Sequence, residues 1–154
     1  MSARRRPAAW RLTSSLGAAC LALVACAGEQ MPLSASGVTI LEPIPGQDRT
    51  VAYLTLDNAG HVPITLNRVT SPQFAAVEMH ATILDDGVAG MQALDAITIA
   101  EGSSVAFDTG GRHLMLIRPR ESLEVGDQVT LEFHHEPPGL LILSAPLRSR
   151  RLDD

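Results

Sequence analysis

The sequence contains no lysine and few aromatic residues. Its positive charge comes from 12 arginines against 17 acidic residues, which gives a net charge of −5. Nucleic-acid binders need a cationic surface and a P-loop needs a lysine, so we expect neither nucleic-acid nor nucleotide-phosphate binding. An aromatic content of 3% also excludes a base-stacking platform. The core of the domain is therefore expected to be aliphatic.

Cysteine is also scarce. Cys20 lies in an apolar segment that we expect to be removed, and Cys26 follows that segment directly. A domain without further cysteine has no disulfide, no thiolate nucleophile and no cysteine-rich zinc site. The sequence also lacks a GxSxG elbow and an HExxH zinc motif. We therefore expect no enzymatic activity.

The first 25 residues have the composition of a secretory signal. Four arginines precede an apolar run from Leu16 to Ala25. That run is too short to span a bilayer of about 30 Å as a helix. It ends in Leu-Val-Ala-Cys, which resembles a bacterial lipobox, so we predict that Cys26 is lipidated and becomes the new N-terminus. The alternative is an ordinary signal peptide that is cleaved nearby.

This prediction divides the chain into four parts. Residues 1–25 are the signal, 26–36 the lipidated cysteine and a flexible tether, 37–147 the folded domain, and 148–154 a frayed polar tail. Without the signal, eight arginines face the same 17 acids, a net charge of −9. We expect a monomer in the periplasm, held to a membrane through lipid alone. Ala27, in place of an aspartate that retains lipoproteins at the inner membrane, favours the outer membrane.

Short runs rich in valine, isoleucine, leucine and threonine recur about every ten residues from residue 37 onwards. Turn-forming sequences separate them, and no helical period of any length is present. This rhythm predicts an all-β fold, an antiparallel β-sandwich of Greek-key type. The predicted strands are Val38–Leu41, Val51–Asp57, Ile64–Val69, Ala76–Leu84, Met91–Ile99, Ser104–Phe107, His113–Ile117, Gln128–His134 and Leu140–Ser144.

Any chemistry of this domain must come from histidine and methionine. His113 and Met115 are separated by one residue on a predicted strand, so both side chains project from the same face. His80 and Met91 flank the turn sequence 85–87 almost symmetrically, which predicts that they lie nearly opposite each other on a hairpin. The two pairs could converge into one site with four ligands.

Two imidazoles and two thioethers have a definite metal preference. Thioether sulfur is neutral, soft and polarisable, which favours Cu(I) over magnesium, calcium or zinc. A blue-copper electron-transfer site is excluded because it requires a cysteine thiolate. The sequence therefore predicts a site for one Cu(I) ion.

The spacing of these four residues resembles that of a known family. His80, Met91, His113 and Met115 reproduce the pattern H-x10-M-x21-H-x-M of the PCuAC periplasmic copper chaperones, and the resemblance extends over residues 37–147. It implies a cupredoxin-like sandwich that carries Cu(I) and passes it to the CuA centre of cytochrome c oxidase, directly or through a Sco-type copper protein.

The sequence also departs from that family. Thr82 stands where many members have a further methionine, and Val88 and Ala89 stand where many have a methionine-rich hairpin turn. These departures argue against loading with several copper ions. Two other functions stay open: a lipoprotein that stores or buffers copper, and a metal-free interaction module built on the same sandwich.

The remaining histidines and methionines have simpler interpretations. Met79, adjacent to His80, is predicted to point to the opposite face of its strand and into the core. His61, His134 and His135 are predicted to be solvated residues of turns and strand ends. For His134 and His135 the alternative is an incidental contact with Cu(II) or Ni(II).

Overall fold

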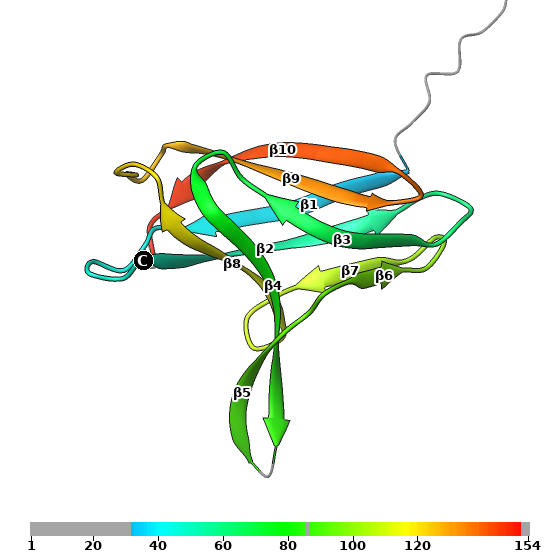
Figure 1. Ribbon diagram of the computed structural model, residues 1–154, viewed down its shortest axis with the longest axis horizontal. Helices are drawn as coiled ribbons and strands as arrows, with labels where there is room; N and C mark the ends of the chain where they lie inside the picture. Colours follow the sequence, from blue (N-terminus) through cyan, green and yellow to red (C-terminus); the bar gives the residue numbers. More distant parts are fainter. Residues whose placement is uncertain (1–31, 86, 152–154) are drawn as a thin grey trace, which may run out of the picture.

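The computed structural model describes residues 32–85 and 87–151, which form strands joined by turns (Figure 1). In these ranges no helix is long and apolar enough to cross a membrane. The predicted signal, Cys26 and residues 26–31 of the predicted tether lie outside the described residues. The strands are β1 (Leu33–Leu41), β2 (Arg49–Asn58), β3 (Ile64–Thr70), β4 (Phe74–Asp85), β5 (Val88–Ala93), β6 (Ile97–Ile99), β7 (Ser104–Phe107), β8 (Arg112–Pro119), β9 (Gln128–Glu136) and β10 (Gly139–Arg148).

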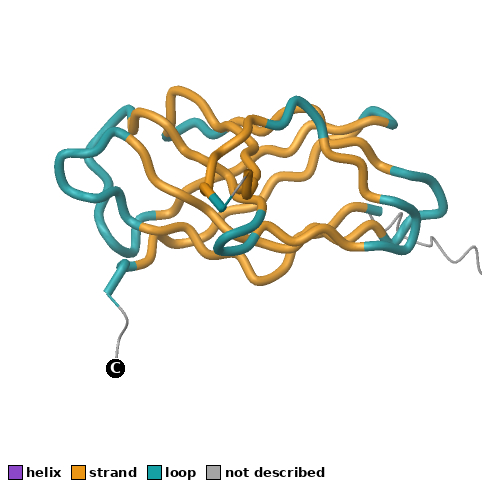
Figure 2. The backbone as a smooth tube through the Cα atoms, turned by 90° about the horizontal axis from the view of Figure 1, so that it is seen from below, coloured by secondary structure: helices purple, strands orange, loops and turns teal. Residues whose placement is uncertain are grey.

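The strands are hydrogen-bonded in the order β5-β4-β8-β2-β1-β10-β9-β3-β6, and β7 pairs with β2. A further pairing between Val69 of β3 and Val77 of β4 connects the two sides of this path. The strands thereby enclose one core between two facing layers, and many of the turns lie at the ends of the long axis (Figure 2). The all-β sandwich predicted from the sequence is confirmed. One pairing differs from the antiparallel prediction, because β1 runs parallel to β10, with Ile40 beside Leu147.

The core follows from the alternation of side chains along the strands. In β2 the buried residues Ala52, Leu54 and Leu56 alternate with half-buried ones, as expected for a strand with one face on the core. Leucine and isoleucine make up most of the core cluster, which also contains the three phenylalanines, valine, alanine and Met79. Burying each such side chain contributes about 1.5–3 kcal/mol. The predicted aliphatic core is confirmed.

The first strand begins before the predicted start of the domain. β1 starts at Leu33, so the prediction of a tether over 26–36 is wrong for residues 33–36. Leu33 is buried and pairs with Asn58 of β2, whose side-chain amide donates to the carbonyl oxygens of Val62 and Ile99. Small polar residues concealed this part of the strand in the sequence. Gly37, at a φ of 62°, lies where the β1–β2 register shifts, which interrupts the regular strand pattern.

The first residues of the predicted polar tail are more ordered than expected, whereas its residues 152–154 lie outside the described residues. Arg148 closes β10, and the next two residues bind Glu42 instead of forming a frayed tail. The Glu42 carboxylate accepts hydrogen bonds of 3.0 Å from the Ser149 hydroxyl and the Arg150 backbone N–H. The Arg150 guanidinium donates to the Glu42 carbonyl oxygen at 2.7 Å. We call Glu42, Ser149 and Arg150 the terminal clasp.

The predicted strand over 91–99 is divided in two. β5 ends at Ala93, and the chain bends before it pairs with β3 as β6. β4 is longer than predicted, and its pairing with β8 ends at Ala81. Beyond Ala81, β4 pairs only with β5, and this hairpin projects away from the sandwich (Figure 1).

Candidate metal site

The register between β4 and β8 places three of the predicted ligands together. His80 lies opposite His113, and Glu78 lies opposite Met115. Residues that face each other across antiparallel strands share one face of the sheet, so His80, His113 and Met115 lie on the same face. The alternate residue Met79 is 5% exposed and belongs to the core cluster, which confirms its predicted position.

Met91 lies on the same face, although its predicted partner is wrong. The hairpin closes with Asp85 paired to Val88, so Met91 lies opposite Thr82 and not opposite His80. Thr82 is two residues from His80, and residues two apart on a strand point to the same side. Met91 is therefore a diagonal neighbour of His80, and all four predicted ligands share one face of β5, β4 and β8.

The two imidazole rings are close and partly oriented by neighbouring groups. Their centroids are 5.8 Å apart, with the ring planes tilted by 33°. His80 Nε2 donates to a Glu78 carboxylate oxygen at 2.9 Å, and His113 Nδ1 donates to the Gly111 carbonyl oxygen at 3.4 Å. The remaining nitrogens, His80 Nδ1 and His113 Nε2, are buried without a hydrogen-bond partner in the described structure.

These unpartnered nitrogens point to a ligand. A buried polar atom without a partner loses its hydration without compensation, so such atoms are rare unless something binds them. Because the other nitrogen of each ring carries the proton, the free nitrogens have lone pairs available. Metal-binding histidines show this arrangement, in which an oxygen holds one ring nitrogen and the metal takes the other.

The four side chains differ in accessibility. His113 and Met115 are 5% and 8% exposed, and Met115 stands outside the aliphatic core cluster. The His80 side chain is 14% exposed, whereas Met91 is 66% exposed on the projecting hairpin.

No group of three or more histidine, cysteine, aspartate or glutamate residues among the described residues is arranged to hold a metal. A metal at this face would therefore depend on the thioethers.

The remaining histidines lie elsewhere. His61 is exposed, as predicted. The prediction of solvated side chains is wrong for His135, which is buried, and for His134, which is half-buried and hydrogen-bonds to Thr70. The turn before β10 folds back over His135, whose Nδ1 donates to the Pro137 carbonyl oxygen at 2.9 Å. A side chain at Gly139 would collide with this ring.

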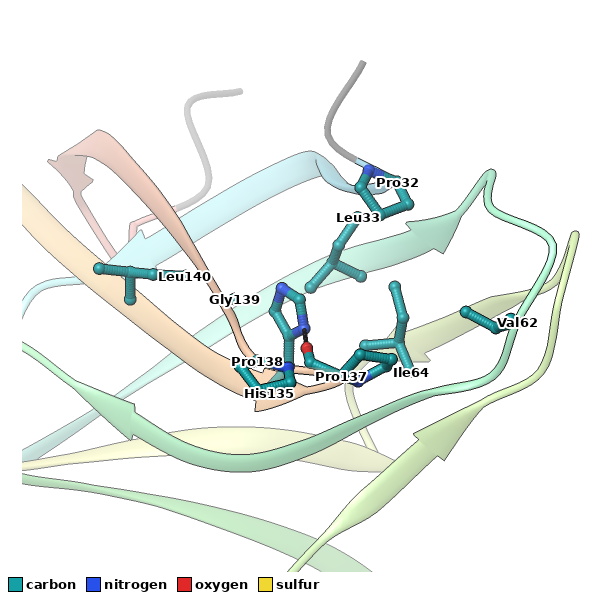
Figure 3. A pocket seen from close by; sticks show the side chains of 9 residues that line it. All are labelled: Pro32, Leu33, Val62, Ile64, His135, Pro137, Pro138, Gly139 and Leu140. Carbon is teal, nitrogen blue, oxygen red and sulfur yellow. Dashed lines mark hydrogen bonds between the residues drawn. The ribbon is translucent and has the colours of Figure 1, made fainter. Parts of the chain in front are cut away.

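His135 lies in an apolar cavity of about 260 Å³ (Figure 3). The cavity is lined by Pro32, Leu33, Val62, Ile64, His135, Pro137, Pro138, Gly139 and Leu140. None of the four predicted ligands is among these residues, so the cavity is separate from the candidate metal site.

Two groups of the site were not singled out from the sequence. Glu78 lies two residues before His80, and the alternation along a strand would have placed it on the same face. The sequence Thr-Gly-Gly at 109–111 predicts the turn before β8, but it does not predict that the Gly111 carbonyl accepts a hydrogen bond from His113.

Comparison with known proteins gives the family. Residues 33–146 match the model of the family described as "Putative lipoprotein LpqE-like". The chain belongs to the LpqE-like family. It is 34% identical over 82 residues to the uncharacterized protein RP573 of Rickettsia prowazekii (strain Madrid E), a match that covers 53% of this chain and 45% of that protein. The chain spans about half the length of the curated relatives it matches.

Two solved structures are similar in fold. The solution structure of the Cu(I) form of DR1885 from Deinococcus radiodurans is 26% identical, with a TM-score of 0.62 over 81% of this chain and 84% of that chain. The copper-bound PCuAC domain from PmoF2 is 22% identical, with a TM-score of 0.64 over 77% of this chain and 93% of that domain. The resemblance to PCuAC domains predicted from the sequence is thus confirmed in the fold.

Proposed function

We propose that this protein binds one Cu(I) ion between His80, Met91, His113 and Met115 and delivers it to another copper protein. The main support is the pair of buried imidazole nitrogens without hydrogen-bond partners, on the face that also carries two methionines. The copper-bound state of two proteins with the same fold supports the same proposal.

The donor set suits Cu(I) as a cargo. Two thioethers and two neutral imidazoles provide soft or borderline ligands without charge, a set that fits a soft monovalent ion. His80 would bind through Nδ1 and His113 through Nε2, because Glu78 and the Gly111 carbonyl occupy the other ring nitrogens. These two hydrogen bonds select the ring tautomers before copper binds.

The unequal exposure of the ligands favours transfer over permanent retention. His113 and Met115 are shielded, whereas Met91 is open to solvent on the hairpin. A competing ligand can replace the exposed thioether first, while the shielded residues still hold the ion. Thiolates are stronger ligands for Cu(I) than thioethers, so copper would pass to a thiolate acceptor. The proposed recipients are the CuA subunit of cytochrome c oxidase and a Sco-type protein.

The proposed location follows from the leader sequence and the family. Cys26 would carry the lipid that attaches the chain to a membrane facing the periplasm, with the outer membrane favoured by Ala27. The family description as a lipoprotein supports this proposal. The domain would act as a monomer and would contact the membrane through its lipid alone.

Copper titration followed by transfer tests this function. The purified chain is titrated with Cu(I) under anaerobic conditions in competition with bathocuproine disulfonate, and one ion per chain is expected. The loaded chain is then mixed with a reduced apo CuA domain or a reduced Sco-type protein, and the copper is followed by mass spectrometry. Failure to bind copper would favour the metal-free interaction module, and binding without transfer would favour storage or buffering.

A further inference from the structure

We infer that the β4–β5 hairpin is the docking element for the copper acceptor, which encloses the hairpin in an apolar groove. This inference rests on the proposed copper function. We call the exposed apolar residues Ile83, Leu84, Val88 and Met91 the hairpin tip.

The hairpin tip concentrates apolar surface in one short segment. Four of the nine large exposed apolar side chains in the described residues lie between positions 83 and 91. Leu84 and Val88 are 78% and 71% exposed, more than any of the other seven. Contiguous apolar patches on soluble proteins mark interaction sites, whereas isolated ones need no explanation.

The hairpin tip is apolar on both faces of the ribbon. Leu84 pairs with Ala89 on the face of the metal site, in line with Met91. Ile83 pairs with Gly90 and lies on the opposite face, which it shares with Val88. Pairing with β8 ends at Ala81, so within the described residues the β4 edge of the ribbon has no further strand beside it. Leu84 on one face and Ile83 and Val88 on the other are exposed, so both faces are open. A flat partner surface would cover only one face, so the geometry fits a groove that closes around the ribbon.

The hairpin tip is continuous with the proposed copper ligands. Leu84 and Ala89 extend the face of His80 and Met91 outward along the ribbon. A partner that covers this face also covers Met91, the exposed ligand, and excludes water from its surroundings. Thiolates in the wall of the groove could then approach the thioether that is easiest to displace.

The position of the hairpin favours a protein partner over the lipid bilayer. β1 begins at one end of the long axis, whereas the hairpin projects from the middle of the sandwich (Figure 1). Cys26 is six residues from Pro32, so a lipid there would lie within roughly 20 Å of the β1 end. The turn sequence of the hairpin contains two consecutive aspartates, which anionic headgroups would repel. The same charge predicts a basic rim around the groove of the partner.

A double substitution tests the inference. Leu84→Ser combined with Val88→Ser is made in the full chain, and Val62→Ser combined with Leu140→Ser serves as a matched control at the apolar cavity. Cu(I) affinity and removal of copper by bathocuproine disulfonate should equal those of the wild type in both variants. Transfer to the reduced apo CuA domain or Sco-type protein should slow roughly tenfold or more for the hairpin variant alone, since two anchor residues of an interface are lost.

Each other outcome contradicts the inference in a distinct way. Transfer by the hairpin variant at the wild-type rate would refute docking and leave the copper function intact. A wild-type chain that binds Cu(I) but transfers it to neither protein would refute the delivery function, and the docking role with it. Self-association or sedimentation with anionic phospholipid vesicles that the hairpin substitutions abolish would assign the tip to a second copy or to a membrane. Weaker copper affinity in the hairpin variant would show that the hairpin tip contributes to the copper site and not to docking.

Discussion

Glu78 and His80 lie two residues apart on one face of β4, and His80 Nε2 donates to the Glu78 carboxylate at 2.9 Å. This contact assigns the proton to Nε2 and leaves Nδ1 free for a metal. We predict that Glu78→Ala weakens Cu(I) binding by roughly 10–100-fold, the usual effect of removing such a supporting group. Glu78→Gln should cost less, because its amide oxygen still accepts the bond.

Competition titration measures the affinities, and ¹⁵N NMR of the imidazole nitrogens identifies the His80 tautomer. Glu101→Ala, in an exposed turn, serves as the control. Unchanged affinity and an unchanged tautomer in Glu78→Ala would show that the carboxylate does not position His80.

Substitution of two methionines should separate copper binding from stability. Met79→Ala should lower the free energy of unfolding by about 2–5 kcal/mol and leave Cu(I) affinity nearly unchanged, because Met79 is a core residue. Met91→Ala should change stability by less than about 0.5 kcal/mol, because its side chain is exposed, yet weaken copper binding strongly.

Urea denaturation and copper competition on the same preparations provide both quantities. Met115→Ala and His113→Ala should also weaken copper binding, since each removes a proposed ligand. Similar loss of copper in Met79→Ala and in these variants would identify a packing cluster and not a metal site.

The oxidation state of copper should determine how tightly this protein binds it. Cu(II) prefers harder nitrogen and oxygen ligands in tetragonal geometry, which two thioethers do not supply. We therefore expect tight binding of Cu(I) and weak binding of Cu(II). Electron paramagnetic resonance of the copper-loaded chain, before and after oxidation, should show Cu(II) released to a competing chelator. Retention of Cu(II) at the same site would contradict the assigned ligands.

The terminal clasp should make stability depend on pH. The Arg150 backbone N–H, then the Ser149 hydroxyl, hold the pKa of the Glu42 carboxyl below its ordinary value. A lowered folded-state pKa stabilises the fold above the unfolded value of about 4.3, and this contribution is lost as pH falls through the lower folded value. Glu42→Gln should therefore be less stable than the wild type at neutral pH, and the difference should shrink in strong acid.

Unfolding curves of both proteins over the acid range provide this comparison. The exposed residue Glu121 offers a control, and Glu121→Gln is measured over the same pH range. A difference between wild type and Glu42→Gln that persists undiminished in strong acid would exclude the carboxylate as its cause.

Attachment to a membrane should depend on one residue. Cys26→Ser should release the mature domain into the soluble periplasmic fraction without loss of the fold, because β1 begins at Leu33. A diacyl lipid provides two chains, which suffice for stable anchoring, whereas one chain is marginal. Fractionation of cells that express each form gives the result. A wild-type chain already in the soluble fraction would contradict lipidation.

Local patterns predicted the side-chain directions but not the strand partners. Alternation along β8 placed His113 and Met115 on one face, and alternation along β4 placed Met79 in the core. The pairing of His80 with His113 joins strands that are distant in sequence, and no local pattern specifies it. The prediction that His80 lies opposite Met91 assumed a turn centred midway between these two residues. The turn is centred one residue further along the chain, between Asp85 and Val88, so His80 lies opposite Ala93.

Tertiary contacts explain the other differences. The composition of residues 33–36 resembles a linker, and only the pairing with β2 makes it a strand. His135 is polar and precedes two prolines, yet the returning turn covers it. The parallel pairing of β1 and β10 could not be predicted from the pattern of apolar residues in either strand. Side chains alternate between the two faces in the same way in parallel and antiparallel strands.

That parallel pairing affects how the chain reaches its native state. β10 lies between β1 and β9, so the first strand lacks one neighbour until the last strand is present. Ribosomal synthesis and passage through a secretion channel deliver β10 after all the other strands. The sheet therefore cannot be completed until β10 has been synthesised and exported. A product truncated before Gly139 would expose the unpaired edges of β1 and β9, which are prone to aggregation.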